Sequence, residues 1–185
     1  MRHGIGLRGL AAATTFALIV VIAANGAPAA AKAADATLVT CIGTQTTNYS
    51  PGLLLTNQTV HKSGTNEWPL CTGSTQGITS ASSPFDVPHI QLSCISPLGS
   101  GAGTQVITWV HATTAPTSTF EWTSTRSVLA GQAVTILTGT ITAGLFAGSS
   151  AQQIIVAPQL NLLGCLLPPG VTEETGTSTL VITAA

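Results

Sequence analysis

Four segments of the sequence decide the fold: GTQVITWVH (Gly103–His111), TSTFEWTSTRSVL (Thr117–Leu129), GQAVTILTGTITA (Gly131–Ala143) and AQQIIVA (Ala151–Ala157). They are rich in Val, Ile, Thr, Phe and Trp, the residue types that fit a pleated, half-buried surface. The breaks between them are short and contain Ala, Pro, Gly and Ser, most of which favour turns. We therefore predict four consecutive β-strands, a central meander around which the rest of the chain is arranged.

The chain on either side of this meander also favours strands over helices. No long segment after the first 33 residues has the 3.6-residue periodicity of an amphipathic helix. Two stretches, His61–Ser83 and Pro158–Gly170, are interrupted by Gly and Pro, and we expect irregular crossovers between two sheets there. Further strands are predicted over Ala36–Gln45, Leu53–Val60, His89–Ile95 and Thr177–Thr183.

The N-terminus has the order of features of a secretory signal peptide. Arg2 and Arg8 give a basic start, Leu10–Ala24 is an apolar run, and an A-x-A pattern ends at Ala33. A membrane anchor is the alternative, although spanning needs about 20 apolar residues. We therefore predict a signal peptide over residues 1–33 and a single secreted β domain over residues 34–185.

The charge of the predicted mature chain limits its partners. After residue 33 only Lys62 and Arg126 are basic, against six acidic residues, which gives a net charge of −4. So few cations cannot neutralise many phosphates, which argues against nucleic acid and against binding to anionic membranes through a basic patch. No second apolar run approaches the length of a membrane span, so none is expected after signal removal.

Four cysteines follow the predicted export signal: Cys41, Cys71, Cys94 and Cys165. An even number in an oxidising compartment predicts two disulfides, and three pairings are possible. We favour Cys41–Cys71, which would tie the opening strand to a later loop, together with Cys94–Cys165, which would enclose the meander. No Cys-x-x-Cys or His-x-x-x-His spacing indicates a metal site.

The resulting fold class is all-β with two disulfides. Several short strands with frequent turns predict an antiparallel β-sandwich with a central meander. A closed antiparallel β-barrel is the alternative, in which the last strand pairs with the first and no sheet edge remains. The residue pattern leaves open whether those two strands pair.

Five sequence elements carry a resemblance to a known family. They are VTCIGT (Val39–Thr44), YSPGL (Tyr49–Leu53), GTQVITW (Gly103–Trp109), TGTITAGLFAG (Thr138–Gly148) and LLPPGVT (Leu166–Thr172). Together they resemble a family of small secreted all-β proteins of actinobacteria. The resemblance extends over most of the chain, and it implies export and an all-β fold but no activity. The Gly144–Gly148 element is also similar to one in dirigent-type barrels.

No catalytic, cofactor or metal motif stands out from the sequence. The mature histidines are His61, His89 and His111, and a metal or acid–base site would need at least two of them to converge with a carboxylate. There is no Gly-x-Ser-x-Gly elbow and no phosphate-binding loop. We therefore predict no catalytic residues, no metal and no cofactor.

The aromatic residues are the candidate ligand-binding residues. Trp109, Phe120 and Trp122 lie on adjacent predicted strands and could form one cluster, either in the core or lining a cavity. Trp68 lies in a predicted loop and is expected to be exposed. Glu121 lies between two of these aromatics, so it should point to the opposite face of its strand.

Three hypotheses about function follow. The first is a non-catalytic extracellular or envelope-associated domain with a structural or protein-binding role, because few ionisable residues remain for chemistry. The second is a module that binds a small apolar ligand or carbohydrate through the aromatic cluster. The third is a secreted hydrolase that uses one of the histidines.

Overall fold

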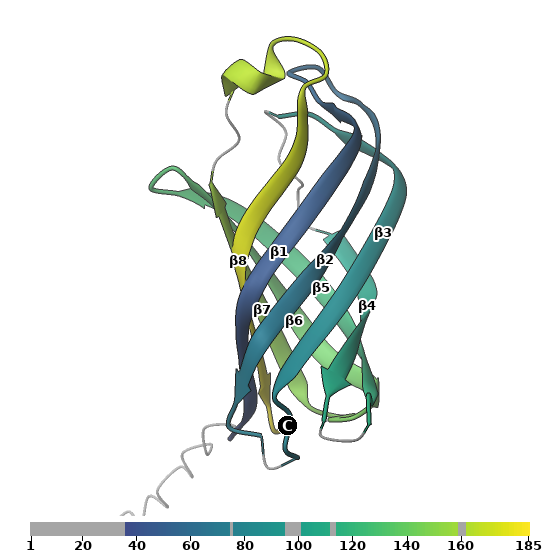
Figure 1. Cartoon of the computed structure of the whole chain (residues 1–185), viewed down its shortest axis with the longest axis vertical. Coiled ribbons are helices and arrows are strands. Elements are labelled where there is room, and N and C mark those ends of the chain that lie inside the picture. Colours follow the sequence, from purple (N-terminus) through teal and green to yellow (C-terminus); the bar gives the residue numbers. More distant parts are fainter. Residues whose placement is uncertain (1–35, 75, 95–100, 112–113, 159–161) are drawn as a thin grey trace, which may run out of the picture. The chain divides into compact units, whose positions relative to one another are not determined.

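The computed structural model describes residues 36–74, 76–94, 101–111, 114–158 and 162–185. The predicted signal peptide lies outside these residues. Residues 34–185 form one compact unit. Its described part contains eight strands and a short 3₁₀ helix (Figure 1): β1 (Thr37–Leu53), β2 (Gln58–Thr72), β3 (Ser80–Leu92), β4 (Gly101–Val110), β5 (Thr117–Leu129), β6 (Gln132–Gly144), β7 (Ser150–Pro158), η1 (Leu162–Cys165) and β8 (Val171–Thr183).

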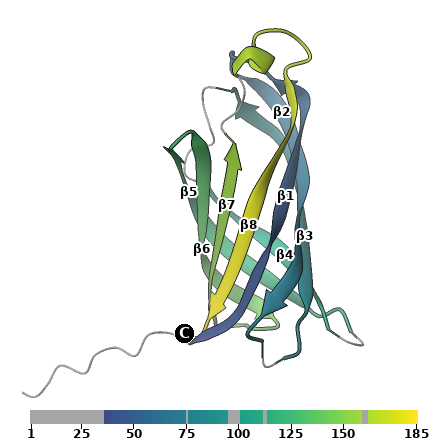
Figure 2. The ribbon, with the colours of Figure 1, turned by 60° about the vertical axis from the view of Figure 1, so that its left-hand side comes forward.

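The strands form a closed barrel in which each strand is antiparallel to the next. β8 pairs with β1 over most of its length, from Val171 opposite Leu53 to Thr183 opposite Thr37. Strands β8, β1, β2 and β3 make one side of the barrel and β4 to β7 the other (Figures 1 and 2). The predicted all-β antiparallel fold is confirmed in its barrel form. The sandwich is wrong, because pairing of the first and last strands leaves one continuous sheet.

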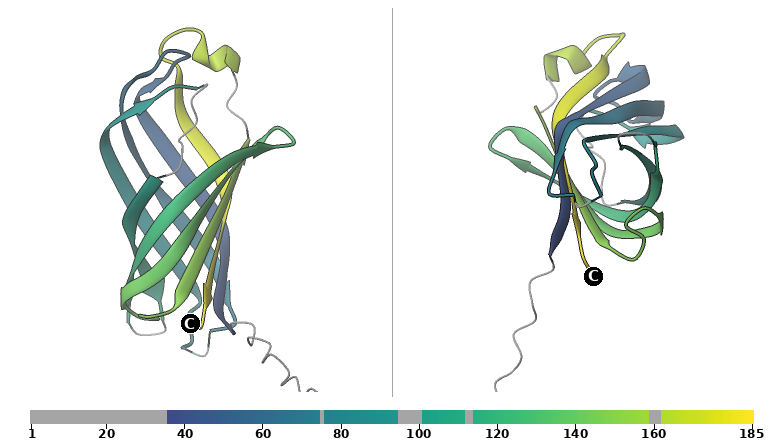
Figure 3. Two further views of the ribbon diagram at one scale, coloured as in Figure 1. Left: turned by 180° about the vertical axis from the view of Figure 1, so that it is seen from behind. Right: turned by 60° about the horizontal axis from the view of Figure 1, so that its bottom comes forward.

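The central meander is confirmed by β4 to β7. Each of these strands begins and ends within two residues of its predicted bounds. The β5–β6 hairpin turns through Ala130 and Gly131, both with positive φ, as the two-residue turn of a twisted hairpin requires. Figure 3 shows this hairpin extending away from the barrel wall.

The two predicted crossovers are wrong. Most of His61–Ser83 belongs to β2 and to the start of β3, which are neighbours in the barrel. Gly64 lies inside β2 because a Cβ there would meet the carbonyl oxygen of Thr46 at 2.1 Å. Pro158–Gly170 ends β7, carries η1 and leads into the adjacent β8. Glycine and proline therefore mark close approaches and a local turn rather than a change of sheet.

Two predicted strand positions near the N-terminal half also need correction. Leu53–Val60 was expected to be one strand, but Leu53 ends β1 and β2 begins at Gln58. Most of the predicted strand His89–Ile95 is the end of β3, which begins earlier, at Ser80. Pro84 lies in the part of β3 that pairs with β2 but not with β4, because only the first three residues of β3 pair with β4, and proline is tolerated where one side of a strand is unpaired.

Both favoured disulfides are present. Cys41 and Cys71 lie opposite each other on β1 and β2, and Cys94 is joined to Cys165 across 71 residues of sequence. Two disulfides indicate an oxidising environment. The first lies in a large hydrophobic cluster with Trp68, Trp109 and Phe120, and the second lies in a smaller cluster with Tyr49 and Leu53.

Candidate functional site

Most of the aromatic candidates lie in the packed half of the barrel. This half is defined by the large cluster around Trp68, Trp109 and Phe120. All three side chains have no exposed surface. Trp68 Nε1 donates a hydrogen bond to Ser178 Oγ at 3.1 Å, and Trp109 Nε1 donates to Ser118 Oγ at 2.8 Å. The expected exposed loop at Trp68 is wrong, because the residue lies inside β2. These rings therefore belong to the core.

A layer of buried amides ends the packed half. The Asn66 Oδ1 atom accepts hydrogen bonds from Gln45 Nε2 at 3.0 Å and from Gln153 Nε2 at 2.7 Å. Gln105 Nε2 donates to Gln153 Oε1 at 2.9 Å, so the layer connects β1, β2, β4 and β7. Such a mutually bonded layer satisfies polar groups that would be costly to bury alone.

Beyond the amide layer the barrel is hollow. A cavity of about 850 Å³ lies there, with Gln45 and Gln105 at its inner end. This volume is within the range of sites that enclose small molecules. Eight-stranded barrels have an interior wide enough either to be filled by side chains or to hold one small ligand. The apolar part of the lining includes Leu92, Trp122, Ala133, Leu137, Ile155 and Ala157.

Trp122 is the one aromatic candidate that lines this cavity. It is partly buried and lies against Gly103 of β4, where a Cβ would come within 2.8 Å of the indole ring. Glu121, next to it on β5, is exposed on the outer face, as the alternation of strand side chains predicts. The predicted aromatic cluster is therefore split between the core and the cavity wall.

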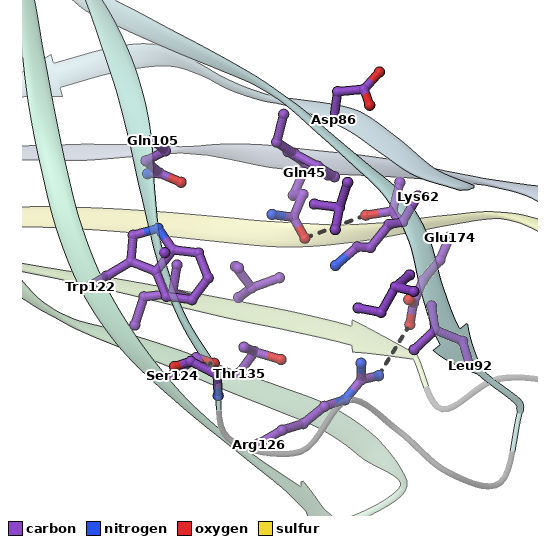
Figure 4. Close-up of a pocket in the computed structure, with 18 of the residues that line it drawn as sticks. Gln45, Lys62, Asp86, Leu92, Gln105, Trp122, Ser124, Arg126, Thr135 and Glu174 are labelled. Carbon is purple, nitrogen blue, oxygen red and sulfur yellow. Dashed lines mark hydrogen bonds and ion pairs between the residues drawn. The ribbon is translucent and has the colours of Figure 1, made fainter. Parts of the chain in front are cut away.

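A charged cluster reaches into the cavity from four strands. Glu174 of β8 accepts a hydrogen bond from the Tyr49 hydroxyl at 2.8 Å on one carboxylate oxygen. Its other oxygen lies 3.7 Å from Nη2 of Arg126, which comes from β5. Lys62 of β2 extends into the same space, with Nζ 5.4 Å from the centre of the Phe85 ring (Figure 4).

Burial changes the acid–base properties of this cluster. Loss of water contact is the largest cause that lowers the pKa of Lys62 to about 8, the positive charge of Arg126 also lowers this pKa, and the charge of Glu174 raises it by less. Burial also raises the pKa of Tyr49 well above its usual range, and the adjacent Glu174 carboxylate adds to that shift through its charge and hydrogen bond. Lys62 is therefore a cation that is poorly compensated by the protein.

Several polar atoms of the cavity lining have no hydrogen-bond partner within the part of the chain that the structure describes. These buried atoms are Nε1 of Trp122, Nε of Arg126 and Oε1 of Glu174. Buried polar groups are nearly always hydrogen-bonded in proteins, to protein or to another molecule. The three residues that carry these atoms all line one cavity, which makes that cavity the candidate functional site.

The histidines do not form a site in the described residues. His61 Nε2 lies 2.9 Å from Asp86 Oδ1, and both side chains are largely exposed, although Asp86 also lines the cavity. His89 has a positive φ on β3, and His111 pairs through its backbone with Thr114. Among the described residues, no three His, Cys, Asp or Glu side chains gather as metal ligands would.

The sequence did not single out Lys62, Arg126 or Glu174 as site residues. Lys62 and Arg126 contributed only to the net charge of the chain. One local signal was available for Arg126. On β5 it lies four residues after Trp122 and six after Phe120, so strand alternation places all three on one face. Glu173 and Glu174 point to opposite faces for the same reason, with Glu173 exposed.

No protein-family model, curated protein or solved structure matches the chain. Within the described residues, no helix has the length and apolar character needed to cross a membrane.

Proposed function

We propose that this protein binds a small molecule inside its barrel. The observation that carries the proposal is the cavity of about 850 Å³ whose lining is mostly apolar yet contains buried polar atoms without partners. An apolar pocket with a few convergent polar groups is the usual form of a small-molecule site. Of the three hypotheses drawn from the sequence, this proposal takes up the second, a module that binds a small molecule. It assigns the binding to a different set of residues.

Two features support binding over simple incomplete packing. The amide layer closes the inner end of the cavity with satisfied hydrogen bonds, so the hollow half is a defined space. At the outer end, the Cys94–Cys165 disulfide joins the smaller cluster around Tyr49 and Leu53. A pocket held between two packed regions is largely preformed, which lowers the entropic cost of binding. Export through the predicted signal peptide would make the protein an extracellular binder.

A neutral fluorescent probe tests this proposal. We expect N-phenyl-1-naphthylamine to show a saturable rise in fluorescence with the oxidised protein, because the dye would leave water for the apolar cavity. The Ala133→Phe variant should reduce this signal, since Ala133 is an inward residue of the cavity wall. The Thr138→Phe variant is the control, because Thr138 lies on the exposed face of the same strand. Absence of a saturable signal with the unmodified protein would contradict the proposal.

A further inference from the structure

The charges of the barrel are distributed unequally between its interior and its surface. Lys62 and Arg126 are the only basic residues in the part of the chain that the structure describes, and both line the cavity. Of the acidic residues in the described ranges, Glu174 lies in the charged cluster and Asp86 lines the cavity with a largely exposed side chain, while the others are exposed: Glu67, Glu121 and Glu173. Surface cations aid solubility, so placing both of them in a cavity points to a different role.

Lys62 has no ion-pair partner within 4.0 Å among the described residues. Across the described residues, the ion pairs within 4.0 Å are His61 with Asp86 and Arg126 with Glu174. The Lys62 ammonium lies over the Phe85 ring, and this cation–π attraction replaces only part of the lost hydration. A buried ammonium without a carboxylate is costly to the folded protein.

Arg126 is only partly satisfied by Glu174. A guanidinium offers five N–H donors, and the single pairing distance of 3.7 Å is longer than a hydrogen bond. Nε of Arg126 has no partner among the described residues, and Glu174 gives its other oxygen to Tyr49. Figure 4 shows the Lys62 and Arg126 side chains extending from different strands into the same space.

We propose that the ligand is an amphiphilic monoanion whose single acid group lies between Lys62 and Arg126. This inference rests on the proposed function. Within the charged cluster, two cations and the Glu174 carboxylate leave one positive charge, which one carboxylate on the ligand would neutralise. Asp86 also lines the cavity, but its side chain is largely exposed and its carboxylate lies 2.9 Å from His61 Nε2. The apolar body of the ligand would then extend past Trp122 towards Leu137 and Ile155, which line the cavity.

Three ligands of equal chain length distinguish the contribution of the acid group to binding from that of the apolar body: decanoate, 1-decanol and decylammonium. Each is titrated into the full chain, in its oxidised form, by calorimetry at pH 7. We expect decanoate to bind at least about tenfold more tightly than 1-decanol, the effect of a hydrogen bond to a charged group. Decylammonium should bind most weakly, because it would meet two like charges.

Substitution of each cation then locates the acid group. Lys62→Met and Arg126→Met should each weaken decanoate binding about tenfold while leaving 1-decanol binding nearly unchanged. Lys62→Arg should restore most of the preference, because it returns the charge. Thr125→Glu is the matched control: it changes the net charge by the same amount as either methionine variant, but Thr125 is exposed on the outside of β5.

The outcomes distinguish this inference from the proposed function. If the neutral probe and all three decyl ligands fail to bind, the proposed function itself is wrong. If decanoate and 1-decanol bind equally well, or decylammonium binds best, only the acid group is wrong and the cavity remains a binding site. If a methionine variant does not fold, the comparison of the three ligands with the unmodified protein still decides the question.

Discussion

The packed half and the hollow half of the barrel are built from the same eight strands but differ in the size of their inward side chains. On β6 the inward position is Ile141 in the packed half and Ala133 in the hollow half; on β8 the corresponding positions are Leu180 and Gly176. The backbone cylinder has room for large side chains throughout. Small residues at these inward positions therefore contribute to the cavity.

The largest expected effect compares two tryptophans, one from each half. Trp109→Ala should lower the free energy of unfolding by about 3–5 kcal/mol, because it leaves a void in a fully packed region. Trp122→Ala should cost only about 1–2 kcal/mol, since one side of that ring already faces the cavity. Chemical denaturation followed by circular dichroism measures both. Equal losses would mean that the hollow half is packed in solution.

The next comparison enlarges two inward alanines on β7. Ala151 belongs to the packed cluster and Ala157 lines the cavity, and both are nearly fully buried. Ala151→Leu should destabilise the protein by about 1–3 kcal/mol through overpacking. Ala157→Leu should change the stability by less than about 1 kcal/mol, because the cavity can accept the added methyl groups. The same denaturation assay tests the pair, and an equal or larger loss for Ala157→Leu would contradict the difference between the halves.

The most gradual expected effect comes from pH. The pKa of Lys62 is about 8 in the folded protein and about 10.5 when unfolded, so between those values the unfolded state binds more protons. Stability should therefore rise from about pH 8 towards pH 10, by at most about 1.4 kcal/mol per pH unit. Above pH 10 the raised pKa of Tyr49 acts in the opposite direction, because its phenol then ionises only in the unfolded state.

Lys62→Met is the variant that isolates this contribution. The groups that face Lys62 in the cavity are Arg126, Glu174 and Tyr49, and the substitution leaves all three in place. Denaturation midpoints for both proteins between pH 7 and pH 10 should diverge, with the rise present only when Lys62 is present. Parallel curves would show that Lys62 is well solvated in the folded protein.

Local sequence features predicted a large part of the fold but little of the site. The meander was predictable because β-branched and aromatic residues alternate between clear turn signals, as in Thr117–Leu129. Glycines in the preceding half misled the prediction: Gly64 looked like a loop residue, yet it sits inside β2 where the backbone of β1 approaches closely. A close approach between strands is not visible in a single segment.

Sequence alone determined the all-β class, the meander and the outward direction of Glu121, because strand propensity, turns and alternation are local properties of the chain. Only the tertiary structure decided between sandwich and barrel, since closure depends on pairing between Thr37–Leu53 and Val171–Thr183, which lie far apart in the sequence. The same closure brings Lys62, Arg126 and Glu174 together across more than 100 residues of sequence. The cavity and its charge are therefore products of strand register around the whole barrel.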